Sequence, residues 1–119
     1  MGKVKVFLSQ GMANRSDDEI LEERHRCIEA LQYYFKKETD EDIEIIDSFI
    51  TEDPPEGSNP GCWYLGKSIE TLSQADYAVF LPRFQDYRGC RLEKRIASEY
   101  DICTICFDAE CHLVTDIEI

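Results

Sequence analysis

The chain has 119 residues, the length of a single domain, and we expect one domain over residues 1–119. With 13 Lys and Arg against 25 Asp and Glu, its net charge of −12 repels a phosphate backbone and argues against a nucleic-acid polymer as partner. No stretch approaches the ~18 consecutive apolar residues of a membrane span, and the first residues lack the pattern of a signal peptide. We therefore expect no membrane partner and a cytoplasmic location.

Strand and helix patterns alternate from the start of the chain. A β-branched and aromatic run at 4–9 predicts the first strand, and a loop follows at 10–14. Ser16 and Glu19 have the spacing of a capping box, which predicts the start of a helix. Apolar residues then recur at helical spacing: Ile20, Cys27, Ile28, Leu31 and Phe35.

Residues 43–46 predict the second strand, and residues 51–61, with three prolines and two glycines, predict a long loop. Asn59 and Pro60 fit the N-cap and first position of the next helix. Four apolar residues of this helix are expected to face the core or a ligand site: Trp63, Leu65, Ile69 and Leu72.

The second half of the chain repeats this alternation. Residues 76–81 predict a central third strand, 82–88 a loop, and 89–100 a helix that opens at the glycine. Residues 102–107 predict the fourth strand, and 112–117 a possible fifth. The pattern predicts an α/β layered domain with a four- to five-stranded, mainly parallel sheet.

Right-handed crossovers place the carboxyl ends of parallel strands at one edge of the sheet, where ligands bind. Three segments should meet there: 9–14, 48–61 and 82–93. A ligand site is therefore expected at this edge before any motif is considered.

The six cysteines allow two interpretations. Cys103 and Cys106 form a C-x-x-C, but within a strand residues three apart face opposite sides. Cys106, Cys111 and His112 lack a second Cys or His pair that would complete a zinc site. We favour buried or incidental thiols over zinc, and expect neither a metal nor another cofactor.

Glu93 is the most informative charged residue. It lies near the expected start of its helix, where the helix dipole favours an ionised carboxylate by about 0.3–1 kcal/mol. Such a carboxylate suits covalent catalysis at an acetal-like carbon. The alternative is a first-turn glutamate that complements the dipole and has no other role.

Gly89-Cys-Arg-Leu-Glu93 follows a hydrophobic strand led by Ala75-Asp76. It is preceded by Phe7-Leu-Ser-Gln-Gly-Met12, by the acidic run Asp17-Asp18-Glu19 and by Trp63-Tyr-Leu-Gly-Lys-Ser-Ile69. In order and spacing these segments resemble the nucleoside 2-deoxyribosyltransferase family, most closely its short bacterial and phage branch. The resemblance implies a flavodoxin-like three-layer α/β fold.

The resemblance also implies a mechanism in which Glu93 attacks the anomeric carbon of a deoxyribonucleoside. The base leaves, a glycosyl-enzyme ester forms, and a second base or water takes the sugar. Three positions depart from the family pattern. The aspartate six residues before the nucleophile is Tyr87 here, with Asp86 one residue away; the aspartate of the preceding helix is Ser68; and the tyrosine of the first strand is Phe7.

Other residues are candidates for binding the substrate. Ser9, Gln10 and Gly11 offer a hydroxyl, an amide and a bare backbone N–H to a sugar or phosphate, or serve the loop alone. Trp63 and Tyr87, with Phe84, would stack on a base or belong to the core. Met12 and Gly89 are further candidates for binding the substrate, because they lie in the segments that carry the family resemblance. Three arginines near the expected site would pair with a phosphate or with surface acids: Arg83, Arg88 and Arg91.

Two functions follow from these residues. The first is a nucleoside or nucleotide N-glycosidic bond transferase or hydrolase with Glu93 as nucleophile and Asp86 as its catalytic partner. The alternative is a non-catalytic protein of the same fold that senses or sequesters a nucleotide. In the family a neighbouring subunit closes each pocket. The apolar residues of segment 111–119 also need a surface against which to pack, so we expect a dimer or a dimer-based homo-oligomer.

Overall fold

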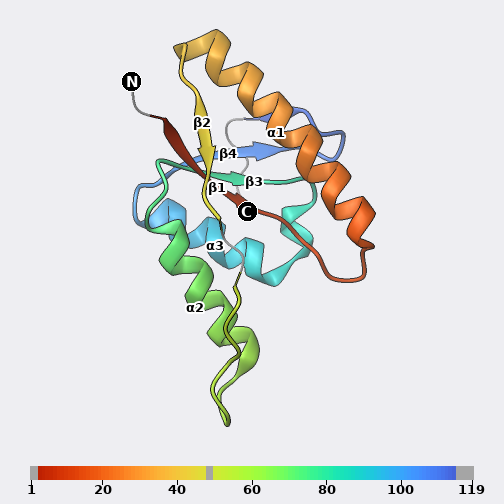
Figure 1. The fold of residues 1–119 in the computed structure, drawn as a ribbon, viewed down its shortest axis with the longest axis vertical. Coiled ribbons are helices and arrows are strands. Elements are labelled where there is room, and N and C mark those ends of the chain that lie inside the picture. Colours follow the sequence, from red (N-terminus) through yellow and green to blue (C-terminus); the bar gives the residue numbers. More distant parts are fainter. Residues whose placement is uncertain (1–2, 48–49, 115–119) are drawn as a thin grey trace.

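A five-stranded sheet forms the centre of the protein in a computed structural model that describes residues 3–47 and 50–114 (Figure 1). The strand order is β2-β1-β3-β4-β5, so the chain has a three-layer, flavodoxin-like α/β fold, which confirms the prediction. In chain order the elements are β1 (Val4–Ser9), α1 (Asp17–Thr39), β2 (Ile43–Ile45), α2 (Pro60–Leu72), β3 (Tyr77–Phe80), a short 3₁₀ turn η1 (Phe84–Asp86), α3 (Arg88–Glu99), β4 (Cys103–Phe107) and β5 (Leu113–Val114).

The sheet is parallel except at one edge. β1 pairs with both β2 and β3, and β3 pairs with β4, all in parallel. β3 is therefore central, as its hydrophobic sequence predicts. β5 pairs with β4 in the antiparallel direction over Leu113–Val114, within the predicted 112–117. Residues 115–119 lie outside the described part of the chain, so the rest of that prediction is not tested.

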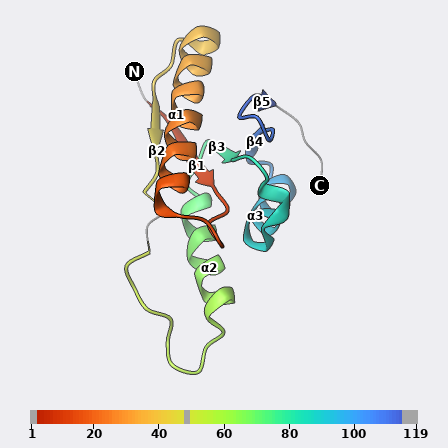
Figure 2. The same ribbon diagram turned by 90° about the vertical axis from the view of Figure 1, so that its right-hand side faces the viewer.

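Alternate residues of each strand face opposite helical layers. On one face, Val6 and Leu8 pack with Leu31 and Phe35 of α1 in a single buried cluster. On the other face, Phe7 belongs to a second buried cluster at the layer of α2 and α3. Figure 2 shows α1 on one side of the strands and α3 on the other.

Local capping chemistry fixes where the first two helices begin. The Ser16 side chain accepts the Glu19 N–H at 3.2 Å and the Glu19 carboxylate accepts the Ser16 N–H at 3.4 Å, which confirms the predicted capping box. Asn59 caps α2 by accepting the Cys62 N–H at 3.1 Å, and Pro60 follows at the first helical position. Segment 50–59 and the start of α2 extend away from the sheet (Figure 1).

The predicted strand ends differ slightly from the observed ones. β3 begins at Tyr77 and not at residue 76, although the Asp76 N–H still donates to the Lys5 carbonyl at 2.8 Å. β2 ends at Ile45, and the Ile46 N–H continues the pairing to Val6 at 2.9 Å. Each strand is therefore extended by single hydrogen bonds beyond its regular part.

All six cysteines are free thiols. Cys103 is exposed and Cys106 is buried, which confirms that this pair faces opposite sides of β4. Within the described residues, no helix has the length and apolar character needed to cross a membrane.

Candidate functional site

A cavity of about 600 Å³ lies at the carboxyl end of β1 and beside the segment that follows β2. The chain leaves β1 toward β2 on one side and returns to β3 on the other, and ligands bind at such a reversal of strand order. Residues from five segments line this cavity, which we call the Glu93 cavity: Phe7, Leu8, Ser9, Gln10, Met12, Ile20, Leu21, Arg24, Asp47, Ile50, Ser68 and Glu93.

Glu93 is the buried carboxylate of this cavity, with 8% of its surface exposed. The Ser9 hydroxyl donates a hydrogen bond of 2.6 Å to Glu93 Oε1, and the Ser68 hydroxyl donates another to the same carboxylate. Burial raises the pKa of Glu93 above its usual value, while the two hydroxyl hydrogen bonds oppose that rise. Three predicted site residues therefore meet in one cluster.

The expected effect of the helix dipole on Glu93 is wrong. α3 begins at Arg88, one residue before the predicted glycine, and Tyr87 is its N-cap. Glu93 is consequently in the second turn, beyond the turn in which the dipole acts strongly. The dominant influence on its pKa is burial, and burial favours the protonated carboxyl.

The hydroxyl that β1 presents to Glu93 comes from Ser9 and not from position 7, which is a phenylalanine. Both side chains point to the same face of β1 because they are two residues apart, and Ser9 is closer to the carboxyl end. The serine therefore reaches Glu93 where the resemblance implies a tyrosine. Nearby Cys90 is buried, and burial raises its pKa to about 11, so it remains a neutral thiol.

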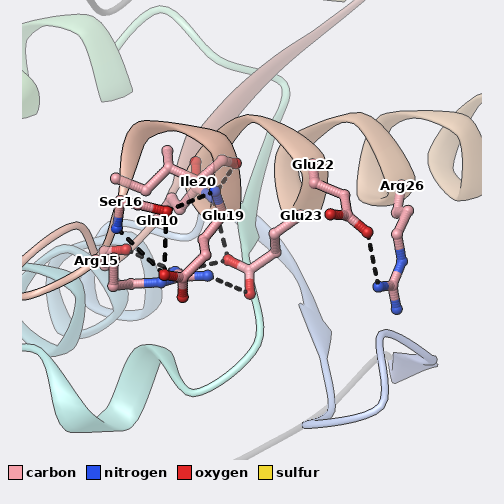
Figure 3. A network of polar contacts seen from close by, with 9 residues as sticks. Gln10, Arg15, Ser16, Glu19, Ile20, Glu22, Glu23 and Arg26 are labelled. Carbon is pink, nitrogen blue, oxygen red and sulfur yellow. Dashed lines mark hydrogen bonds and ion pairs between the residues drawn. The ribbon is translucent and has the colours of Figure 1, made fainter.

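A network of polar contacts holds Gln10 against the start of α1 (Figure 3). Gln10 Nε2 donates to the Ile20 carbonyl at 2.9 Å and to Glu23 Oε1 at 3.1 Å. Glu23 in turn accepts two hydrogen bonds of 2.9 Å from Arg15, whose guanidinium also donates to the Gly11 carbonyl at 2.8 Å. The donors of Gln10 are thus used by the protein itself, and its Oε1 has no partner among the described residues.

Sequence reasoning did not identify Arg15 and Glu23. The hydrogen bonds with Glu23 raise the pKa of Arg15, and both side chains are mostly buried. Their spacing of eight residues is not a recognised helix pairing, because Arg15 precedes the helix and reaches forward along it. An arginine immediately before the capping serine was the available signal.

Gly11 and Tyr87 are in close contact. A Cβ atom on Gly11 would lie 2.1 Å from Tyr87 Cδ2 and 2.4 Å from Cγ, so the ring occupies the space that any other residue would need. Tyr87 and Asp86 line a second, neighbouring cavity of about 520 Å³, together with Arg83. Neither residue is among those that line the Glu93 cavity.

Two other predicted residues, Trp63 and Gly89, are not among those that line the Glu93 cavity. Trp63 is half-buried on α2, with the Lys67 Nζ 5.5 Å from its ring centroid, and it lines neither of these two cavities. Gly89 is an exposed residue of the first turn of α3 and has open space around it. Among the three predicted arginines, Arg91 donates a hydrogen bond of 2.7 Å to the Gln85 carbonyl, so it stabilises the turn before α3.

Arg24 and Asp47 add charge to the wall of the Glu93 cavity, and neither was singled out from the sequence. Burial lowers the pKa of Arg24, while the nearby Asp47 carboxylate opposes that shift. No cluster of three or more His, Cys, Asp or Glu side chains suited to a metal ion occurs within residues 3–47 and 50–114. Comparison of the chain with known protein families, curated proteins and solved structures finds no match.

Proposed function

We propose that the protein cleaves or transfers the N-glycosidic bond of a nucleoside or nucleotide, with Glu93 as the nucleophile. The observation that supports this most directly is the buried Glu93 carboxylate, held at 2.6 Å by Ser9 inside a cavity of about 600 Å³. The cavity is large enough for a small ligand and lies where this fold binds ligands. A buried carboxylate with a perturbed pKa at such a place is a candidate catalytic group.

In the proposed reaction, a Glu93 oxygen forms a bond to the anomeric carbon as the bond from that carbon to the base nitrogen breaks. The electron pair leaves with the base, which takes up a proton, and a glycosyl ester remains on Glu93. Water or a second base then attacks the same carbon and releases the carboxylate. The hydroxyls of Ser9 and Ser68 stabilise the carboxylate as it leaves.

The leaving base needs a proton donor. Asp86, the expected partner, lines the neighbouring cavity, so it would serve only after segment 83–87 moves. Met12 and Gln10 remain candidates for contact with the base or sugar, because both line the Glu93 cavity.

Base release tests the proposal. The purified protein is incubated with a panel of ribonucleosides, deoxyribonucleosides and their 5′-monophosphates, and free base is measured by chromatography. Glu93→Gln should abolish release, because an amide cannot form the ester. Glu99→Gln is the matched control, because it changes an exposed glutamate of the same helix that pairs with Arg95 at the surface. Release that survives Glu93→Gln would exclude Glu93 as the nucleophile.

A second candidate function is nucleotide binding without catalysis. It is favoured by the position of Asp86 outside the Glu93 cavity and by the raised pKa of Glu93, which weakens it as a nucleophile. A ligand that binds the native state raises the melting temperature by mass action. A nucleotide that raises the melting temperature, with no base released at high protein concentration, would support binding over catalysis.

We also propose that the protein forms a dimer or a dimer-based oligomer. Met12 and Leu21 are apolar, more than half exposed and adjacent to the Glu93 cavity, so a second subunit would cover them and enclose the ligand. Light scattering tests this directly. A concentration-independent mass of 13.8 kDa, the mass of one chain, would exclude it.

A further inference from the structure

Two thiols meet on the face of the sheet that α1 covers. Cys27 lies in α1 with none of its surface exposed, inside the cluster that contains Leu31 and Phe35. Cys111 is half-buried in the turn between β4 and β5 and packs against the same cluster. The two side chains therefore share one cluster and interact with each other, although they are far apart in the sequence.

The turn that carries Cys111 is held by Asp108. The Asp108 N–H donates to the His112 carbonyl at 2.9 Å, and the Asp108 carboxylate accepts the Glu110 and His112 N–H groups at 3.0 and 2.9 Å. The Cys111 N–H donates to the Asp108 carbonyl at 3.0 Å. These bonds fix the backbone on both sides of Cys111, which packs against the cluster that contains Cys27.

The remaining cysteines differ from this pair in their surroundings. Cys62 and Cys103 are exposed on α2 and β4, and Cys103 and Cys106 face opposite sides of their strand. Cys62 and Cys103 are therefore accessible thiols that provide controls for non-specific oxidation.

We propose that Cys27 and Cys111 are an oxidation site at which the folded protein forms a reversible disulfide with a peroxide as the oxidant. The Cys111 sulfur, which is partly accessible, attacks one peroxide oxygen and the O–O bond breaks. The leaving hydroxide takes the Cys111 proton to form the first water, and a sulfenic acid remains on Cys111. The Cys27 sulfur then attacks the Cys111 sulfur, and the departing hydroxide takes the Cys27 proton to form water. Two thiols lose two electrons, and one hydrogen peroxide becomes two waters.

The burial of the two thiols sets this order. Cys27 is enclosed by the core, and burial raises its pKa, so it remains a thiol and meets no oxidant from solvent. Cys111 is the partner that solvent reaches. The disulfide would connect α1 to the turn between β4 and β5, closing a long loop of the unfolded chain, and should raise the melting temperature on the order of 10 °C.

Peptide mapping after mild oxidation tests the proposal. The folded protein is treated with a small excess of hydrogen peroxide, the remaining thiols are alkylated at low pH under denaturing conditions, and linked peptides are identified by mass spectrometry. We expect a monomer lighter by the mass of two hydrogen atoms, with the Cys27 peptide joined to the Cys111 peptide. A higher melting temperature should return to its starting value on reduction with dithiothreitol.

Variants separate this pair from the other thiols. Cys111→Ser, in a surface turn, should remove both the link and the rise in melting temperature, whereas Cys62→Ser with Cys103→Ser should leave both unchanged. Recovery of Cys27 as an unlinked, alkylated thiol after Cys111 has been oxidised would overturn the proposal. So would a link from Cys27 to any other cysteine.

Discussion

Removal of the Ser9 hydroxyl should destabilise the protein by an amount that depends on the charge of Glu93. The hydrogen bond of 2.6 Å joins a hydroxyl to a buried carboxylate, and bonds to charged groups contribute about 1.5–3 kcal/mol. At pH 7 we therefore expect Ser9→Ala to lower the free energy of unfolding by about 1.5–3 kcal/mol. With an m-value of about 1.5 kcal/mol per molar urea, the unfolding midpoint should fall by roughly 1–2 M.

A double-mutant cycle isolates this interaction. In a Glu93→Gln background the same serine donates to a neutral amide oxygen, and its removal should cost about 0.5–1.5 kcal/mol. The difference, on the order of 1 kcal/mol, is the coupling between the hydroxyl and the charge. Thr51→Ala, which removes an exposed hydroxyl from the loop between β2 and α2, is the control and should change stability by less than about 0.5 kcal/mol. Effects of Ser9→Ala and Glu93→Gln that add within about 0.3 kcal/mol would refute the reasoning.

Three further predictions concern the same region. Because burial raises the pKa of Glu93, the stability that its protonated form provides below the unfolded pKa is lost as the pH rises through the folded pKa. Glu93→Gln should lack this loss, so in urea unfolding its stability should rise relative to the wild type as the pH increases to 7, and equal pH profiles would contradict this. Gly11→Ala should lower the free energy of unfolding by about 1–3 kcal/mol, because the new methyl group would collide with the Tyr87 ring, and adding Tyr87→Ala should restore part of that stability. Gly66→Ala, at a helical position with open space around it, should be neutral or stabilising. Glu23→Gln should lower the free energy of unfolding by about 1.5–3 kcal/mol, because Arg15 loses a charged partner. The adjacent Glu22→Gln is the control: its ion pair with Arg26 is exposed and 4.0 Å long, so stability should change by less than about 0.5 kcal/mol in the same assay.

The parts of the fold that could be predicted are those with local causes. Ser16 and Glu19 satisfy each other's backbone at the start of α1, and Asn59 with Pro60 does the same for α2, so the sequence alone indicates both helix starts. The alternation of strand and helix patterns predicts a parallel sheet, and a parallel sheet predicts a ligand site at the carboxyl edge, near Glu93. Each of these inferences needed information from within a few residues.

The site could be predicted only in outline because its contacts are not local. The bond between Ser9 and Glu93 joins residues on β1 and α3, and no sequence pattern specifies which strand residue reaches the carboxylate. A shift of one residue at the start of α3 moved Glu93 out of the turn where the dipole acts. Likewise, the position of Asp86 beside a different cavity depends on how the turn at η1 packs.

The charge of Glu93 is difficult to explain by its role in the fold. A glutamine at this position would accept the hydrogen bonds from Ser9 and Ser68 and avoid the cost of burying an ionised group. A carboxylate that two hydroxyls stabilise incompletely, at the edge where this fold binds ligands, is better explained by chemistry performed there than by stability. The pH dependence of Glu93→Gln is therefore informative about function as well as folding.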